Sequence, residues 1–218
     1  MKIPARVERA AWGVALAVAG LTAATGAAVA PGFQPNIDSA AIDRAIALGQ
    51  SRDPDALQRF HDGYVIRLND VLLDRLEIVT EFRRVVLETE GRARVRDPEW
   101  GPKQAVDMLR PWRDKVTLSL HVTFPPNNVY RTMPRFDLVL YGRPGAAHAG
   151  IPMQPLDLLE TPRYVSGQPA PPGTPILAGI VQATFAARPL DPRGVYLAGI
   201  AMEGRELRRV EIDFGRLE

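Results

Sequence analysis

Hydrophobic and polar residues alternate along residues 115–124, and this is the clearest regular pattern in the chain. The apolar positions are Val116, Leu118, Leu120, Val122 and Phe124, and the polar positions between them are Thr117, Ser119, His121 and Thr123. Successive side chains of a β-strand point to opposite faces of its sheet. The pattern therefore predicts a strand with one buried face and one face exposed to water.

Further strands are expected on both sides of this segment. Residues 136–141, 176–187 and 195–202 form apolar runs of strand length, and Val210, Ile212 and Phe214 alternate with polar residues near the end of the chain. Glu203-Gly204 is typical of a hairpin turn. Residues 64–68 and 76–80 are rich in residues that favour strands, although residues 71–76 also fit a helical period.

Apolar residues at spacings of three and four predict helices over residues 39–48, 81–96 and 102–109. Asp38 or Ser39 is expected to cap the first helix and Thr80 the second. A further short helix should begin at Pro54 and form a helical hairpin with the helix over residues 39–48.

Two faces are expected on the helix over residues 81–96. The face directed to the core carries Phe82, Val85, Val86, Thr89 and Ala93. The other carries Arg84, Glu88, Arg92 and Arg96. Acid and base alternate at a spacing of four on this second face, which favours a solvated surface of salt bridges over a phosphate clamp.

The segment over residues 143–175 contains eight prolines, at positions 144, 152, 155, 162, 169, 171, 172 and 175. Proline disrupts helices and central strands, so the segment is expected to be an ordered loop with at most a short edge strand at residues 156–160. The fold class predicted from the whole pattern is α+β. Residues 31–218 should form one domain, in which a mainly helical half (31–112) packs on an antiparallel β-sheet or sandwich (115–218).

The first thirty residues resemble an export signal. Lys2, Arg6 and Arg9 precede an uncharged, alanine-rich run over residues 10–30 that ends in small residues. The segment is interpreted as a cleavable signal peptide, with an uncleaved N-terminal anchor as the alternative. Either form places the rest of the chain outside the cytoplasm, in the periplasm or the medium, with membrane contact only through residues 10–30 if they are retained.

Composition narrows the possible functions. The leader holds three of the 27 basic and one of the 25 acidic residues, which leaves 24 of each in the remainder, so a nucleic-acid partner is not expected. The chain has no cysteine, which excludes disulfides, thiol nucleophiles and thiolate metal sites. The three histidines lie too far apart in sequence for a zinc motif, and no phosphate loop or nucleophile elbow is present. No catalytic residue, metal or cofactor is therefore predicted.

Five residues are candidates for ligand contacts: His121, Ser119 and Thr123 on the predicted polar strand face, and Trp100 and Trp112. The tryptophans bracket the helix over residues 102–109, and their rings are expected either to anchor the core or to form a platform for a sugar or peptide. Asp137, Asp157 and Glu160 are the candidate carboxylates for a glycosidase, although ordinary surface acids explain them as well.

The sequence thus favours an exported, non-enzymatic module that binds a protein or an envelope component. Its first candidate surfaces are the polar strand face around His121 and the proline-rich segment, because loops on a rigid sheet commonly present ligand contacts. An extracytoplasmic glycan hydrolase with paired carboxylates and a carrier of small apolar ligands are the alternatives.

Overall fold

The computed structural model describes residues 33–142, 150–164, 171 and 173–217. Its helices are α1 (Ser39–Gly49), α2 (Pro54–Asp62), α3 (Glu81–Arg94) and α4 (Pro102–Leu109), with 3₁₀ turns η1 (Arg110–Trp112) and η2 (Phe214–Arg216). Its strands are β1 (Val65–Arg67), β2 (Leu73–Val79), β3 (Lys115–Thr123), β4 (Phe136–Gly142), β5 (Pro152–Met153), β6 (Asp157–Tyr164), β7 (Ile176–Ala186), β8 (Val195–Met202) and β9 (Arg205–Asp213). This content confirms the predicted α+β class. The N-terminal leader lies outside the described residues.

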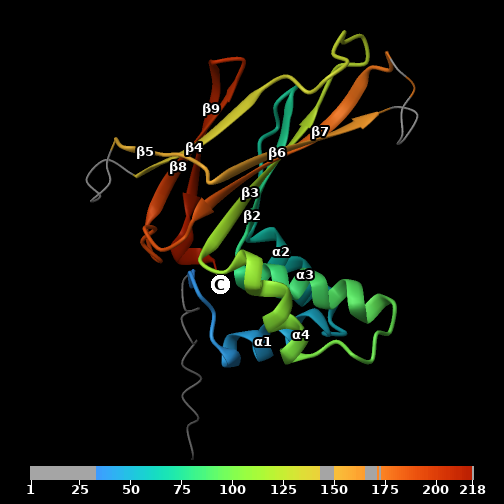
Figure 1. The fold of residues 1–218 in the computed structure, drawn as a ribbon, viewed down its shortest axis with the longest axis vertical. Coiled ribbons are helices and arrows are strands. Elements are labelled where there is room, and N and C mark those ends of the chain that lie inside the picture. The colour runs from blue at the N-terminus through green and yellow to red at the C-terminus, as the bar shows by residue number, and fades with distance from the viewer. Residues whose placement is uncertain (1–32, 143–149, 165–170, 172, 218) are drawn as a thin grey trace, which may run out of the picture.

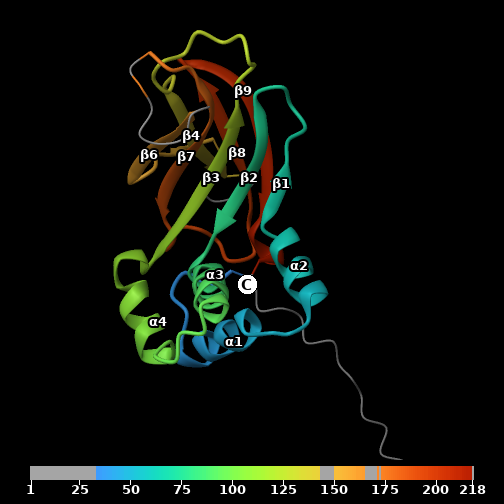
Figure 2. The same cartoon turned by 90° about the vertical axis from the view of Figure 1, so that its right-hand side faces the viewer.

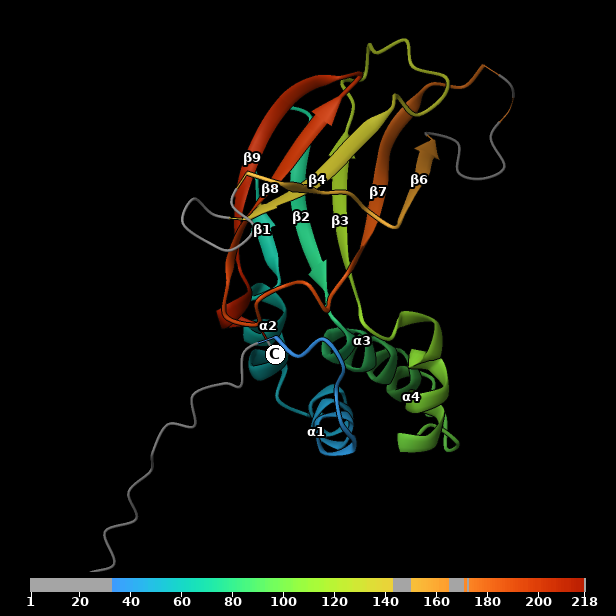
Figure 3. The ribbon, with the colours of Figure 1, turned by 60° about the vertical axis from the view of Figure 1, so that its left-hand side comes forward.

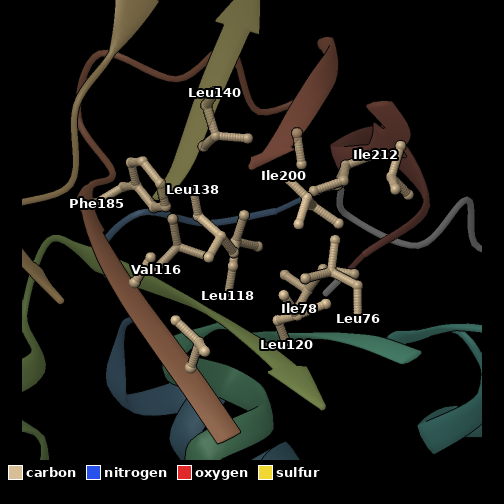
Figure 4. Packing of buried hydrophobic residues seen from close by; sticks show 14 of the residues in the cluster. Leu76, Ile78, Val116, Leu118, Leu120, Leu138, Leu140, Phe185, Ile200 and Ile212 are labelled. Carbon is tan, nitrogen blue, oxygen red and sulfur yellow. The ribbon is translucent and has the colours of Figure 1, made fainter. Parts of the chain in front are cut away.

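The strands form two antiparallel sheets that face each other as a sandwich (Figures 1 and 3). The five-stranded sheet has the order β1-β2-β3-β7-β6, and the four-stranded sheet has the order β5-β4-β8-β9. Their inner faces enclose one apolar core, in which Leu118 of β3, Leu138 of β4 and Ile200 of β8 are each at most 1% exposed (Figure 4). The core forms because each strand directs every second side chain between the sheets.

The helices gather at one end of the sandwich and do not cover a sheet face (Figure 2). A second apolar cluster holds α1, α3 and α4 together, with Ala45, Val85 and Leu109 fully buried in it. The expected hairpin of the first two helices is wrong, since α1 packs against α3 and α4 while α2 lies against β1. Gly49 permits the close approach of α1 and α3, because a Cβ atom at that position would lie 2.6 Å from Thr89 Cβ.

Local signals account for several element boundaries. Asp38 caps α1 by accepting from the Ala41 amide, and Thr80 caps α3 by accepting from the Arg83 amide. Glu203 and Gly204 form the tight turn between β8 and β9, and both have positive φ angles, of 51° and 75°. The predicted ranges of α4 and β8 agree with the structure at both ends.

The proline-rich segment is more structured than expected. The expected short edge strand at residues 156–160 is the eight-residue strand β6, which pairs with β7 along its length, and β5 adds a second short pairing to β4. Pro162 is tolerated within β6 because this strand lies at the edge of its sheet and has a partner on one side alone. Residues 143–149, 165–170 and 172 of this segment lie outside the described part.

Candidate functional site

The second face of β3 is not the open, wet surface that alternation predicts. Thr117 is 4% exposed and Ser119 is 5% exposed, although both point away from the sandwich core. β3 is the central strand of its sheet, and Ser119 lies between Glu77 on β2 and Gln182 on β7. Thr117 lies beside Thr184 and accepts a hydrogen bond from Arg84 of α3. No helix of the described chain lies over this face in Figure 2. Side chains from the neighbouring strands and from α3 therefore hide these two residues.

Polar side chains from three adjacent strands gather on this surface, with the apolar residues Val79 and Ile180 among them, and we call it the outer polar face. It consists of Glu77 on β2, Thr117, Ser119, His121 and Thr123 on β3, and Gln182 and Thr184 on β7. The Thr117 and Thr184 hydroxyl oxygens lie 3.3 Å apart, and Gln182 Nε2 donates to Ser119 Oγ over 3.3 Å. Antiparallel register places each of these pairs directly opposite one another. The row is thus held in place by its own hydrogen bonds.

The middle of the outer polar face is organised by the carboxylate of Glu77, which lies opposite Ser119. Its Oε1 atom lies 2.8 Å from Arg75 Nε and 3.0 Å from His121 Nε2, and its Oε2 atom lies 3.2 Å from Arg83 Nη2. The hydrogen bond with His121, followed by that with Arg75 and the charge of Arg83, lowers the pKa of Glu77 to about 2 against the opposing effect of burial. Glu77 is therefore ionised at neutral pH.

Arg83 joins this carboxylate to the interior of the protein. Its side chain is 4% exposed, and Nη1 donates to the Ile78 carbonyl at 2.7 Å and to the Tyr64 carbonyl at 3.4 Å. Its guanidinium also lies 5.2 Å from the centre of the Tyr64 ring. A buried cation is stable only when it has such partners. The Glu77–Arg83 pair therefore ties α3 to β2 and to the entry of β1.

The end of the outer polar face next to the helices carries Arg84, a cation that has no carboxylate partner in the described structure. The Arg84 guanidinium stacks on Trp112 at 3.7 Å from the ring centre, and its Nη2 atom donates to Thr117 Oγ1 over 3.3 Å. Burial lowers the pKa of Arg84 to about 10, and no described carboxylate counteracts this effect. The expected face of salt bridges on α3 is thus only partly correct. Arg92 bonds Glu88 and Asp97, but Arg84 turns to an aromatic ring.

The structure brings together four of the five residues singled out from the sequence. Ser119, His121 and Thr123 share the outer polar face, and Trp112 adjoins it through Arg84 and Thr117. His121 is less accessible than expected, with 16% of its side chain exposed, because Glu77 and Arg75 lie opposite it.

Trp100 lies apart from these residues. Its Nε1 atom donates to Thr89 Oγ1 at 2.8 Å. The ring lines an open surface pocket of about 290 Å³ with Arg92, Asp97, Glu99, Gln104, Asp107 and Met108. The two tryptophans therefore contact α3 at separate points. Arg92 lies over the ring of Trp100, and Arg84 lies over the ring of Trp112.

The candidate carboxylates do not face one another. Asp137 lies on the outer side of β4, in the four-stranded sheet, beside Arg135. Asp157 lies on the outer side of β6, in the five-stranded sheet, opposite Thr184 of β7. Glu160 points inward and accepts a hydrogen bond from the Phe136 amide at 3.1 Å. Since a glycosidase needs two carboxyl groups across one cleft, these three residues do not form such a pair.

A second pocket of about 210 Å³ opens between β1, β2 and the C-terminal end of β9. Its lining residues include Ile66, Ile78 and Leu217, but also Glu211, Asp213 and Arg216. This mixed lining differs from the dry cavity that a carrier of apolar ligands needs. Across the described ranges, no group of three or more histidine and acidic side chains is placed to hold a metal ion, and no helix is long and apolar enough to cross a membrane.

Comparison with known proteins adds no relative. No protein-family model, curated protein or solved structure matches the chain.

Sequence reasoning missed Glu77, Arg84 and Gln182 as members or neighbours of this site. Each comes from a different element and meets β3 only through strand pairing or helix packing. The alternation in β3 was the one signal that pointed to the face. A search for polar residues at alternate positions in the neighbouring strands would have found Gln182 and Thr184.

Proposed function

We propose that this protein is an exported, non-enzymatic binding module and that the outer polar face is its recognition surface. The ligand we propose is a protein or another component of the cell envelope. The observation that carries the proposal is the row of mutually bonded polar side chains on three central strands, where a sheet covered by another layer would carry apolar residues. Export is supported by the basic and alanine-rich leader.

The rigidity of the surface suits recognition. Its residues stand on paired strands of a packed sandwich, so that little side-chain freedom is left to lose on binding. The three candidate carboxylates, Asp137, Asp157 and Glu160, do not face one another, and the described pockets carry charged side chains that do not suit an apolar cargo. Neither alternative therefore gains a specific observation.

The test is site-specific photo-crosslinking in cells that export the full chain. A photoreactive residue at Gln182 or Thr123 samples the outer polar face, and one at Glu211, exposed on β9, samples the four-stranded sheet as a matched control. We expect Gln182 and Thr123 to give the same adduct in the envelope fraction and Glu211 to give none. Equal adducts from both sheets, or none from the outer polar face, would overturn the assigned surface. Recovery of the full-length chain in the cytosol would contradict export.

A further inference from the structure

Four arginines of the described chain are at least partly buried, and they differ in one respect. Arg75 and Arg83 bond Glu77, and Arg113 Nη1 lies 2.7 Å from Glu81 Oε2. Arg84 alone among them has no carboxylate partner in the described structure. Buried cations are normally paired, because removing the charge from water costs free energy that an anion repays. The difference between Arg84 and its three counterparts therefore needs an explanation.

The hydrogen-bonding edge of Arg84 is still available. Nη2 donates to Thr117 Oγ1, and the described residues provide no acceptor for Nε and Nη1. Neither of these two nitrogens is sealed from solvent, since Arg83 Nε is the one fully buried side-chain nitrogen or oxygen in the described chain that lacks a hydrogen bond. Two donors of one guanidinium thus remain accessible from outside.

Trp112 fixes the plane in which these donors lie. The ring covers one flat face of the guanidinium at 3.7 Å, which leaves the edge of the fork as the part free to bind. A planar guanidinium binds the two oxygens of a carboxylate or phosphate through two parallel hydrogen bonds from nitrogens on one edge. Nε and Nη1 do not share an edge, but Nη2 has a second hydrogen besides the one directed to Thr117, and this hydrogen completes an edge with Nε or Nη1. Because Trp112 and Thr117 already hold the side chain, little conformational freedom is lost when a ligand binds.

We propose that Arg84 and Trp112 form an oxyanion-binding site, which takes a carboxylate or phosphate group of a ligand at the helical end of the outer polar face. The proposal rests on the proposed function in one respect, that the adjoining Thr117 and Thr184 hydroxyls belong to the recognition surface. It assigns the chemistry of one part of the ligand. A bound oxyanion would supply the counter-charge that the other three buried arginines receive from glutamates of the chain.

The experiment is an NMR titration of the purified protein with acetate, with inorganic phosphate and with chloride, in which the Arg84 Nε–Hε signal and Trp112 indole signal are followed. We expect saturable shifts with acetate or phosphate and none that saturates with chloride. Arg84→Gln should weaken binding by about tenfold or more, since the bidentate charged contact is lost. Arg84→Lys keeps the positive charge but lacks the planar guanidinium, so its affinity for the oxyanion should lie between those of the wild type and Arg84→Gln. The matched control is Arg163→Gln, at an exposed arginine on β6.

The acetate and phosphate arms show which oxyanion the site prefers. Shifts that never saturate, or that are equal in the wild type and Arg84→Gln, would overturn the site and leave Arg84 as a packing residue. If Arg84→Gln does not fold, the wild-type titration still decides, because the Arg84 signal either saturates or does not. The outcome is separate from the crosslinking result, since an oxyanion can bind at Arg84 even if the protein partner contacts another surface.

Discussion

Two regions of the outer polar face, the cluster around Glu77 and the helical end at Arg84, pair their charges in opposite ways. The Glu77 carboxylate has three basic neighbours, Arg75, Arg83 and His121, all within 3.2 Å. At the helical end the Arg84 guanidinium has an aromatic ring and a hydroxyl but no described anion. The charges of the Glu77 cluster are paired within the protein, and the cluster connects β2, β3 and α3. The helical end keeps hydrogen-bonding capacity that the fold does not use, and we therefore propose the oxyanion site there.

The largest loss of stability is expected when the Glu77 carboxylate is removed. Glu77→Gln removes the anion from Arg83, which is nearly fully buried, and should lower the free energy of unfolding by about 3 kcal/mol. Urea denaturation measures this loss. The control is Glu88→Gln on the exposed i,i+4 pair with Arg92, which should cost about 0.5 kcal/mol or less. Equal losses in the two variants would show that the Glu77 cluster is as weak as a surface pair.

Protonation of Glu77 in acid should weaken its interactions with Arg75, Arg83 and His121. The pKa of Glu77 is about 2 in the folded state and 4.5 in its ordinary state. The unfolded chain therefore takes up the proton first, and stability is lost as the pH falls from about 4.5 towards 2. The loss attributable to Glu77 is about 2 to 3 kcal/mol after allowance for its partial exposure.

The acid effect is measured as the difference between the wild type and Glu77→Gln in unfolding experiments from pH 6 to pH 2. Other titrating groups, including Glu81, whose burial raises its pKa, are common to both proteins and cancel in the difference. The gap between the two proteins should close as the pH falls. A gap that stays constant would mean that the Glu77 carboxylate is not held in its ionised form by the fold.

Substitution of the adjacent residues Arg83 and Arg84 compares the two regions directly, with smaller expected losses of stability. Arg83→Met leaves the Ile78 carbonyl without its donor and removes one partner of Glu77, so we expect a loss of about 2 kcal/mol. Arg84→Met removes no ion pair and keeps an apolar chain on Trp112, so we expect a change within about 0.5 kcal/mol. Thermal and urea unfolding measure both. A loss at Arg84→Met as large as that at Arg83→Met would show that the helical end is structural as well.

Periodicity alone was sufficient for much of the fold. The alternation in β3, the apolar runs of β7 and β8 and the spacing in α4 each located an element, because burial of one face imposes a period that local sequence shows. The strand β6 was underestimated because the prolines of the segment around it argue against a central strand, and sequence does not show that this segment lies at an edge.

The candidate site was only partly predictable. Period two shows which residues of β3 share a face, so Ser119, His121 and Thr123 were grouped correctly. It does not show what lies beside them, and Ser119 is flanked by Glu77 of β2 and Gln182 of β7, whereas Thr117 is contacted by Arg84 of α3. Arg84 was assigned to a solvated row on α3, because helical spacing places it four residues from Glu88. Its contact with Trp112 depends on how η1 folds back against α3, which is a tertiary event.

The most direct test of this account is a crystal structure of the purified protein grown with inorganic phosphate. The account predicts a phosphate in the plane of the Arg84 guanidinium, beside Trp112 and Thr117, with the Glu77 cluster unchanged and free of anions. An Arg84 fork that stays empty, or that bonds a carboxylate of its own chain, would contradict it.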